Sequence, residues 1–187
     1  AMTLLAFQPC LLHERQGVTE SIALQLLRQR LQVMWITALP RSFWEYRLQV
    51  VPELQALQRV HTGVSGAYGI RHNKPLTRAK AIAEKIETFA PDVVIVEELT
   101  DVLNLRTAQT YKMHDYLWSI KDALRTVPKC AVLLIHKTTA RIDERHLPNS
   151  VAGSVYVAAV PDVIWLYLLV DDTPQFVFAK SKAGYEP

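Results

Sequence analysis

Ionisable side chains that could bind a metal ion or a phosphate follow two apolar segments of the chain. The segment DVVIVE is a run of β-branched residues that ends in Glu97, and AVLLIH ends in His136, which Lys137 follows. A carboxylate such as Glu97 can hold Mg²⁺ through water, and a lysine can place a positive charge beside a phosphate. The simpler alternatives are a solvated carboxylate at the edge of a sheet and an exposed loop lysine.

Short apolar strands alternate with helices along the chain, as judged from hydrophobic periodicity. The expected strands are residues 3–12, 33–39, 92–97, 131–136, 163–170 and 175–180. The expected helices are residues 20–32, 42–57 with a break at Pro52, 77–89 with Thr77 as the N-cap, and 107–126, while residues 62–75 are expected to be a loop. Wholly apolar strands alternating with helices indicate a parallel sheet covered on both faces. We therefore expect a three-layer α/β domain with an antiparallel hairpin at one edge.

The composition is that of one globular domain, which we expect to span residues 1–187. Half of the residues are hydrophobic and 21% are charged, as in ordinary globular proteins. The net charge of +3 permits a nucleic-acid partner but does not require one, since a binding face is a clustered patch. There is neither an apolar run long enough to span a membrane nor a secretory signal, so we expect a cytoplasmic protein without a membrane partner.

Two further features of the chain carry little functional information. Cys10 and Cys130 have no ligand-like spacing, so no metal site is expected. Ala1 before Met2 reads as an added residue, with Met2 as the natural start or a chosen domain start.

Three segments of the chain, in their order and spacing, resemble the RecA-fold P-loop ATPases. They are PDVVIVEELTDVL, CAVLLIHKTTA, and GSVYVAAVPDVIWLY followed by FVFAKSKAGYEP. The chain is most similar to the RepA-type hexameric replicative helicases. The resemblance covers roughly residues 80–187 and, more weakly, the N-terminal part. It implies a RecA-like domain, ATP and Mg²⁺ as the ligands of the family, and assembly into oligomers.

The resemblance implies roles for residues at the strand ends. Glu97 falls at the position of the Walker B aspartate, and His136 and Lys137 fall at the pair that senses the γ-phosphate. Lys180 and Lys182 match the basic pair that reaches the nucleotide of a neighbouring subunit, as an arginine finger does. The alternative for Lys180 and Lys182 is a basic turn after an edge strand.

The phosphate-binding loop departs most from the family's pattern. The family's helix LALQLA corresponds to IALQL, which places the loop at residues 13–21. Thr19 then stands where the Walker A lysine should be, and Glu20 stands where the Mg²⁺-binding hydroxyl should be, with Ser21 adjacent. No lysine occurs before Lys74, so the chain lacks the residue that would reach the β- and γ-phosphates.

The rest of the phosphate-binding loop, and the position of the glutamate that activates water in this family, also depart from the pattern of an active ATPase. Gly17 is the only glycine of the loop and Arg15 its only cation, and a loop with few glycines cannot easily turn its N–H groups towards a phosphate. Glu20 adds negative charge there. Leu39 ends the strand that in this family typically ends near the glutamate that activates water, and it cannot act as a base. The sequence therefore predicts a degenerate nucleotide site without catalytic residues, whose remnants are Arg15, Gly17, Thr19, Glu20, Ser21, Glu97, His136 and Lys137.

Three functions remain open. The first is a catalytically inactive RecA-like protein that binds no ATP, forms homo- or hetero-oligomers, and serves as an accessory, assembly or regulatory factor in a process such as DNA replication or recombination. The second is an active or weakly active ATPase or helicase-like motor, with ATP and Mg²⁺ as cofactors, in which Lys137 or Arg15 replaces the missing lysine. The third is a protein-binding regulator with no DNA contact.

DNA contact by this chain would depend on residues 138–150, where the family's central DNA-facing loop would lie. This segment contains Arg141, Arg145 and His146 as candidate contacts. It also contains Asp143 and Glu144, which weaken phosphate binding and favour a mixed-charge solvated loop as the alternative.

A second candidate for contact with bases is the aromatic and basic cluster around Trp44, which includes Arg41, Phe43 and Arg47. The alternative is that Phe43 and Trp44 pack against the sheet or against a neighbouring subunit. Trp35 lies in an apolar strand and is expected in the core.

Overall fold

The computed structural model of the chain describes residues 2–7, 16–63, 69–71, 74–104, 113–127, 129–137, 155–170 and 173–181. In chain order the elements are β1 (Met2–Phe7), α1 (Gln16–Arg28), β2 (Val33–Thr37), α2 (Arg41–Val50), the 3₁₀ helix η1 (Pro52–Ala56), β3 (Gln58–Thr62), β4 (Gly69–Ile70), α3 (Pro75–Phe89), β5 (Val93–Glu97), α4 (Leu99–Leu103), α5 (Met113–Thr126), β6 (Ala131–Lys137), α6 (Val155–Ala159), β7 (Val163–Val170) and β8 (Thr173–Ser181).

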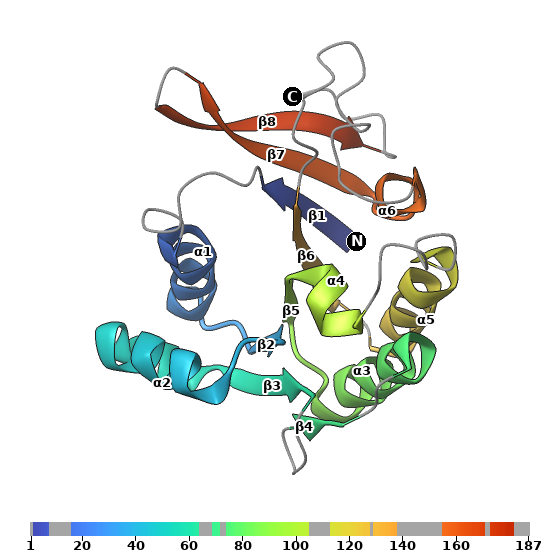
Figure 1. Cartoon of the computed structure of the whole chain (residues 1–187), viewed down its shortest axis with the longest axis horizontal. Helices are drawn as coiled ribbons and strands as arrows, with labels where there is room; N and C mark the ends of the chain where they lie inside the picture. The colour runs from blue at the N-terminus through green and yellow to red at the C-terminus, as the bar shows by residue number, and fades with distance from the viewer. Residues whose placement is uncertain are drawn as a thin grey trace.

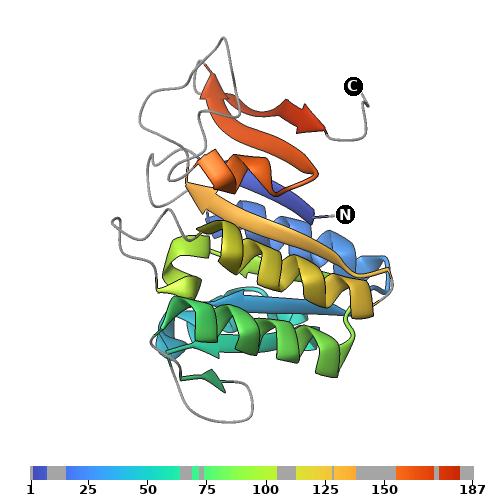
Figure 2. The same ribbon diagram turned by 90° about the vertical axis from the view of Figure 1, so that its right-hand side faces the viewer.

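The strands in the described residues form one sheet in the order β4-β3-β2-β5-β6-β1-β7-β8. Neighbouring strands are parallel, except that β8 runs antiparallel to β7 at one edge. Figure 1 shows α1 and α2 on one face of the sheet and α3 to α6 on the other, and Figure 2 shows the second of these faces. The expected three-layer α/β architecture with an antiparallel edge hairpin is therefore confirmed.

Both faces of the central strands are buried, which explains why their sequences are apolar at successive positions. On β5, Val94 and Val96 belong to the core beneath α3, α5 and α6, whereas Ile95 belongs to the core beneath α1 and α2. On β2, Ile36 and Trp35 divide between the two cores in the same way. Each strand therefore sends alternate side chains to opposite layers, and this alternation decides where the polar side chains at the strand ends point.

Several element boundaries differ from the sequence-based expectation. Helix α1 is already formed at Gln16, so residues 16–21 of the expected phosphate-binding loop are helical. The expected break at Pro52 is confirmed, because α2 ends at Val50 and η1 follows. Helix α3 begins at Pro75, so Thr77 lies inside the helix and is not its N-cap. Proline fits the first turn of a helix because its missing N–H would have no partner there.

Three short elements were not expected from the sequence. Strands β3 and β4 extend the sheet beyond β2. Helix α4 follows β5 directly and packs against it. The expected loop at residues 62–75 was thus wrong in part, since it overlaps the end of β3 and contains β4.

Candidate functional site

The connections that follow β2 and β5 diverge at the carboxyl ends of these two strands. The chain leaves β2 towards α2 on one face of the sheet, and leaves β5 towards α4 on the other (Figure 1). In open α/β sheets, ligands bind where neighbouring strands diverge in this way. Thr37 and Glu97 end these two strands and lie opposite each other in register. The same holds for the neighbouring strands β1 and β6, because α1 follows β1 on one face of the sheet and α6 follows β6 on the other. Both places where successive helices change face therefore lie along the same edge of the sheet.

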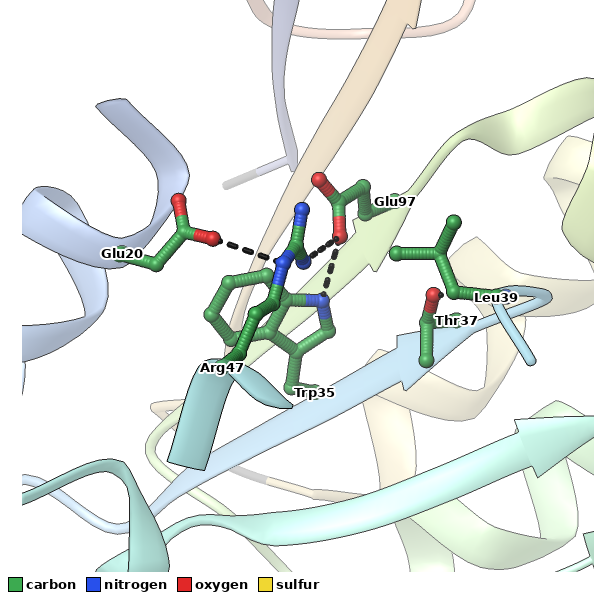
Figure 3. Close-up of polar contacts among 6 residues, drawn as sticks. All are labelled: Glu20, Trp35, Thr37, Leu39, Arg47 and Glu97. Atoms are coloured by element: carbon green, nitrogen blue, oxygen red, sulfur yellow. Dashed lines mark hydrogen bonds and ion pairs between the residues drawn. The ribbon is translucent and has the colours of Figure 1, made fainter. Parts of the chain in front are cut away.

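Glu97 is held by two side chains rather than left open to solvent. Its Oε2 accepts a hydrogen bond from Arg47 Nη1 at 2.9 Å and another from Trp35 Nε1 at 3.1 Å (Figure 3). Because Glu97 has the same alternation as Trp35 and Ile95, its side chain lies on the α1/α2 face of the sheet. The side chain is 16% exposed. The carboxylate is therefore part of the packing between α2 and the sheet.

Glu20 supplies a second carboxylate to the same arginine from the early part of α1. Its Oε1 lies 2.9 Å from Arg47 Nε, but neither carboxylate oxygen of Glu20 makes a hydrogen bond to the described residues. The side chain is only 7% exposed. Burial raises the pKa of Glu20 from 4.5 to about 7, against the opposing effect of Arg47, while the nearby charge of Glu97 raises it slightly further. Near neutral pH, Glu20 therefore exchanges between its protonated and ionised forms.

Arg47 is enclosed by aromatic rings as well as by carboxylates. The carbon atom of its guanidinium lies 5.6 Å, 5.4 Å and 5.7 Å from the ring centroids of Trp35, Phe43 and Trp44. Phe43, Trp44 and Arg47 share one side of α2 because residues three or four apart are neighbours on a helix. Trp44 is 1% exposed, and its ring meets that of Trp35 edge-on at 4.7 Å. The alternative of packing against the sheet is thus confirmed for Trp44.

Two further groups complete this end of the sheet. The backbone N–H of Leu39 donates to Thr37 Oγ1 at 3.1 Å, which closes the turn after β2 (Figure 3). His61 lies in β3, paired with Thr37, and its ring lies 6.2 Å from that of Trp44. Burial lowers the pKa of His61 below its ordinary value, so His61 is neutral at pH 7 and adds no positive charge.

We call the four contacting side chains of Glu20, Arg47, Glu97 and Trp35 the arginine network.

His136 lies on the opposite side of the sheet from the arginine network. It has the same alternation as Val132 and Leu134, which belong to the core beneath α3, α5 and α6. The ring is 2% exposed, and its Nδ1 lies 2.8 Å from Glu98 Oε1. The sequence analysis assigned Glu97 and His136 to one nucleotide site, but in the structure their side chains lie on opposite faces of the sheet.

The other predicted site residues are placed as follows. Gly17, Thr19 and Ser21 lie in α1, where Thr19 is buried and Ser21 is exposed. The backbone of Lys137 ends β6. Arg15, Arg141, Arg145, His146 and Lys182 lie outside the described residues.

Lys180, expected as a finger towards a neighbouring subunit, lies against its own chain. Its Nζ donates to the carbonyl oxygens of Ala158 and Ala159 at the end of α6, the second at 3.1 Å. A lysine here satisfies carbonyl groups that have no partner within the helix. The observed position gives Lys180 a helix-capping role in the single chain.

Arg47 is the site residue whose role sequence reasoning missed. The sequence placed it in a cluster that could stack on bases, whereas the structure places it between two carboxylates. Its spacing from Trp44 on an amphipathic helix was the available signal, because an arginine on a buried face needs an anionic partner.

The described residues offer no alternative metal site: they contain no group of three or more His, Cys, Asp and Glu side chains that could hold an ion. None of the helices in the described part of the chain is long and apolar enough to cross a membrane. Comparison of the chain with protein-family models gives no match, and comparison with curated proteins gives none either.

Proposed function

We propose that the chain is a RecA-like protein whose nucleotide site has been replaced by the arginine network, and that it acts through protein or DNA partners rather than through ATP hydrolysis. In this proposal the protein is an accessory, assembly or regulatory factor of the cytoplasm. The observation that carries the proposal is the position of Arg47, which lies between the carboxylates of Glu20 and Glu97.

The charges of the network support a site that needs no added cation. In the resemblance, Glu97 would hold Mg²⁺ and Glu20 stands at the Mg²⁺-binding hydroxyl. Here the cation beside both carboxylates is a side chain of the protein. Separating a buried ion pair costs about 3–5 kcal/mol, because it leaves an uncompensated charge. An ion competing for Glu97 would therefore bind roughly a hundred to several thousand times more weakly than to a free carboxylate.

The order of the strands also supports the proposal. A nucleotide bound by a loop after β1 would lie against the carboxyl ends of the neighbouring β6 and, one strand further, of β5. Those ends carry His136 and Glu97, and both side chains already have partners inside the chain. The positions that would meet a nucleotide are therefore occupied by internal contacts.

The direct test is calorimetric titration of the chain with Mg-ATP and with a non-hydrolysable analogue. We expect no saturable heat with either ligand, even at protein concentrations high enough to detect millimolar binding. Saturable binding would favour the alternative, a weakly active ATPase in which another cation replaces the Walker A lysine. A matched titration of Arg47→Gln shows whether freeing the carboxylates restores cation binding, with Arg41→Gln on the same helix as the control for charge.

The partner half of the proposal is tested with single-stranded and double-stranded DNA. Binding that weakens with salt would support DNA contact, and the double change of Arg141→Ala and Arg145→Ala should then lower the affinity and flatten its salt dependence. If the chain binds neither DNA nor ATP, the regulator that contacts only proteins becomes the better hypothesis.

A further inference from the structure

Strand β4 forms one outer edge of the sheet in the described part of the chain. It pairs with β3 on one side, and Figure 1 shows it at the end of the sheet next to α3. The carbonyl oxygen of Ile70 accepts a hydrogen bond from the N–H of Gly63 at 2.7 Å, so the backbone groups of Ile70 face β3. Backbone groups of successive residues in a strand point to opposite sides, so those of Gly69 and Arg71 point away from β3. An outer edge of this kind can pair with another extended chain.

A pocket of about 260 Å³ lies beside this edge. Gly69, Ile70 and Arg71 form one wall, and α3 forms the other through residues spaced three and four apart between Ala81 and Thr88. Pockets that enclose a whole small molecule typically measure about 300–1,000 Å³. This pocket therefore suits one side chain of a segment that lies along β4.

The charges that line the pocket favour an acidic side chain. Its cations are Arg71 and Lys85 and its carboxylate is Glu84, which leaves one net positive charge. The ammonium of Lys85 lies 5.7 Å from the ring centroid of Phe89. Arg71, by contrast, is exposed and has neither an ion pair nor a side-chain hydrogen bond with the described residues. A guanidinium binds a carboxylate through two parallel hydrogen bonds, so Arg71 is the group available to an acidic partner.

We propose that the edge of β4 binds an extended acidic segment of a partner protein, which adds a strand to the sheet and places a carboxylate beside Arg71. In this mode, backbone hydrogen bonds supply affinity and the pocket selects the side chain. Gly69 permits the close approach of a second backbone because it has no side chain. A second copy of the chain would bring another unpaired Arg71 to the same edge, and DNA has no amide groups that could continue a sheet. The inference does not depend on the proposed function, since neither the arginine network nor a nucleotide takes part in it.

The test is a titration of the isotope-labelled chain, followed through its backbone amide signals by NMR. The probes are short capped peptides of alternating threonine and valine, with glutamate or glutamine at the centre. We expect the glutamate peptide to shift the amide signals of Gly69 and Arg71 and to bind about tenfold more tightly than the glutamine peptide. The glutamate peptide with N-methylated amides on both sides of the centre should not bind, because it cannot pair with a strand.

Two variants separate the role of Arg71 from the general charge of the chain. Arg71→Gln should remove the preference for the glutamate peptide. Lys80→Gln, which removes a charge from an exposed position of α3 outside the pocket, should preserve it. The proposal fails if the glutamate peptide leaves the amides of Gly69 and Arg71 unshifted, if the N-methylated peptide binds equally well, or if both variants lose the preference.

Two controls without peptide test the other possible occupants of the edge. Shifts of the same amides that grow with protein concentration would assign the edge to a second copy of the chain. Equal shifts with a single-stranded DNA oligonucleotide would assign the pocket to a phosphate. Either result overturns the proposal.

Discussion

Replacing Arg47 with methionine should destabilise the fold more than any other single change at the candidate site. Methionine keeps much of the apolar length of the side chain but removes the cation between Glu20 and Glu97 (Figure 3). It also removes the contacts between the guanidinium and the three neighbouring rings. Breaking a buried ion pair from one side costs about 3–5 kcal/mol. Because domains are stable by only about 5–15 kcal/mol, the loss should be easy to measure.

Urea unfolding at neutral pH, followed by tryptophan fluorescence, measures this loss. Trp35 and Trp44 lie against Arg47, so part of the signal comes from the site itself. The matched control is Arg41→Gln, which removes the same charge from the same helix. The Arg41 side chain is 84% exposed and pairs with Glu45 one turn away. Exposed pairs of this kind are worth about 0.3–0.5 kcal/mol, so the control should unfold close to wild type.

A triple variant separates the charge effect from lost packing. Combining Arg47→Met with Glu20→Gln and Glu97→Gln leaves no buried charge, so it should be more stable than Arg47→Met alone. The reasoning is refuted if Arg47→Met costs less than about 1 kcal/mol, the level of an exposed pair. It is also refuted if the triple variant is no more stable than the single one, since unpaired carboxylates would then not be the cause.

Three further changes test the titration of Glu20 and two positions outside the arginine network. The raised pKa of Glu20, about 7 against an ordinary 4.5, means that the folded chain binds a proton more tightly. The contribution of the Glu20 carboxyl group to the free energy of unfolding is complete below about pH 4.5 and falls by about 3 kcal/mol as the pH rises to about 7. Glu20→Gln should therefore flatten the decrease of the urea midpoint with pH across that range. Arg78 is buried and donates to the carbonyl oxygens of Asp101 and Val102 at 3.2 Å and 3.0 Å. Arg78→Met should therefore cost about 2–3 kcal/mol and speed hydrogen exchange in α4, and unchanged exchange would argue against this capping role. Gly63 has φ +85°, and among the described residues an added Cβ would meet Arg78 Nη2 at an ordinary contact distance of 3.8 Å. Gly63→Ala should therefore cost about 1–2 kcal/mol through the strain of its backbone conformation, measured by thermal unfolding.

The long apolar strands were predictable because each contains consecutive β-branched or aliphatic residues that only a doubly covered sheet can bury. The segment VVIVE of β5 and the segment VIWLYLLV of β7 are examples. Strand β3 was missed because its sequence, QRVHT, has one aliphatic residue among polar ones. It forms through backbone pairing with β2, which local sequence does not encode.

The two carboxylates of the site were predictable from the sequence, whereas the arginine that pairs with them was not. Glu20 and Glu97 stood out because their positions in a resemblance to nucleotide-binding proteins called for a cation nearby. Their actual cation, Arg47, is 50 residues from Glu97 in sequence and meets it only because α2 packs over β2 and β5. The same carboxylate can bind Mg²⁺ or anchor a helix, and the choice depends on whether a cationic side chain reaches it first. In this chain Trp35 also donates a hydrogen bond to Oε2 of Glu97, the oxygen that accepts from Arg47. This second contact holds the carboxylate in the position in which it anchors α2 to the sheet.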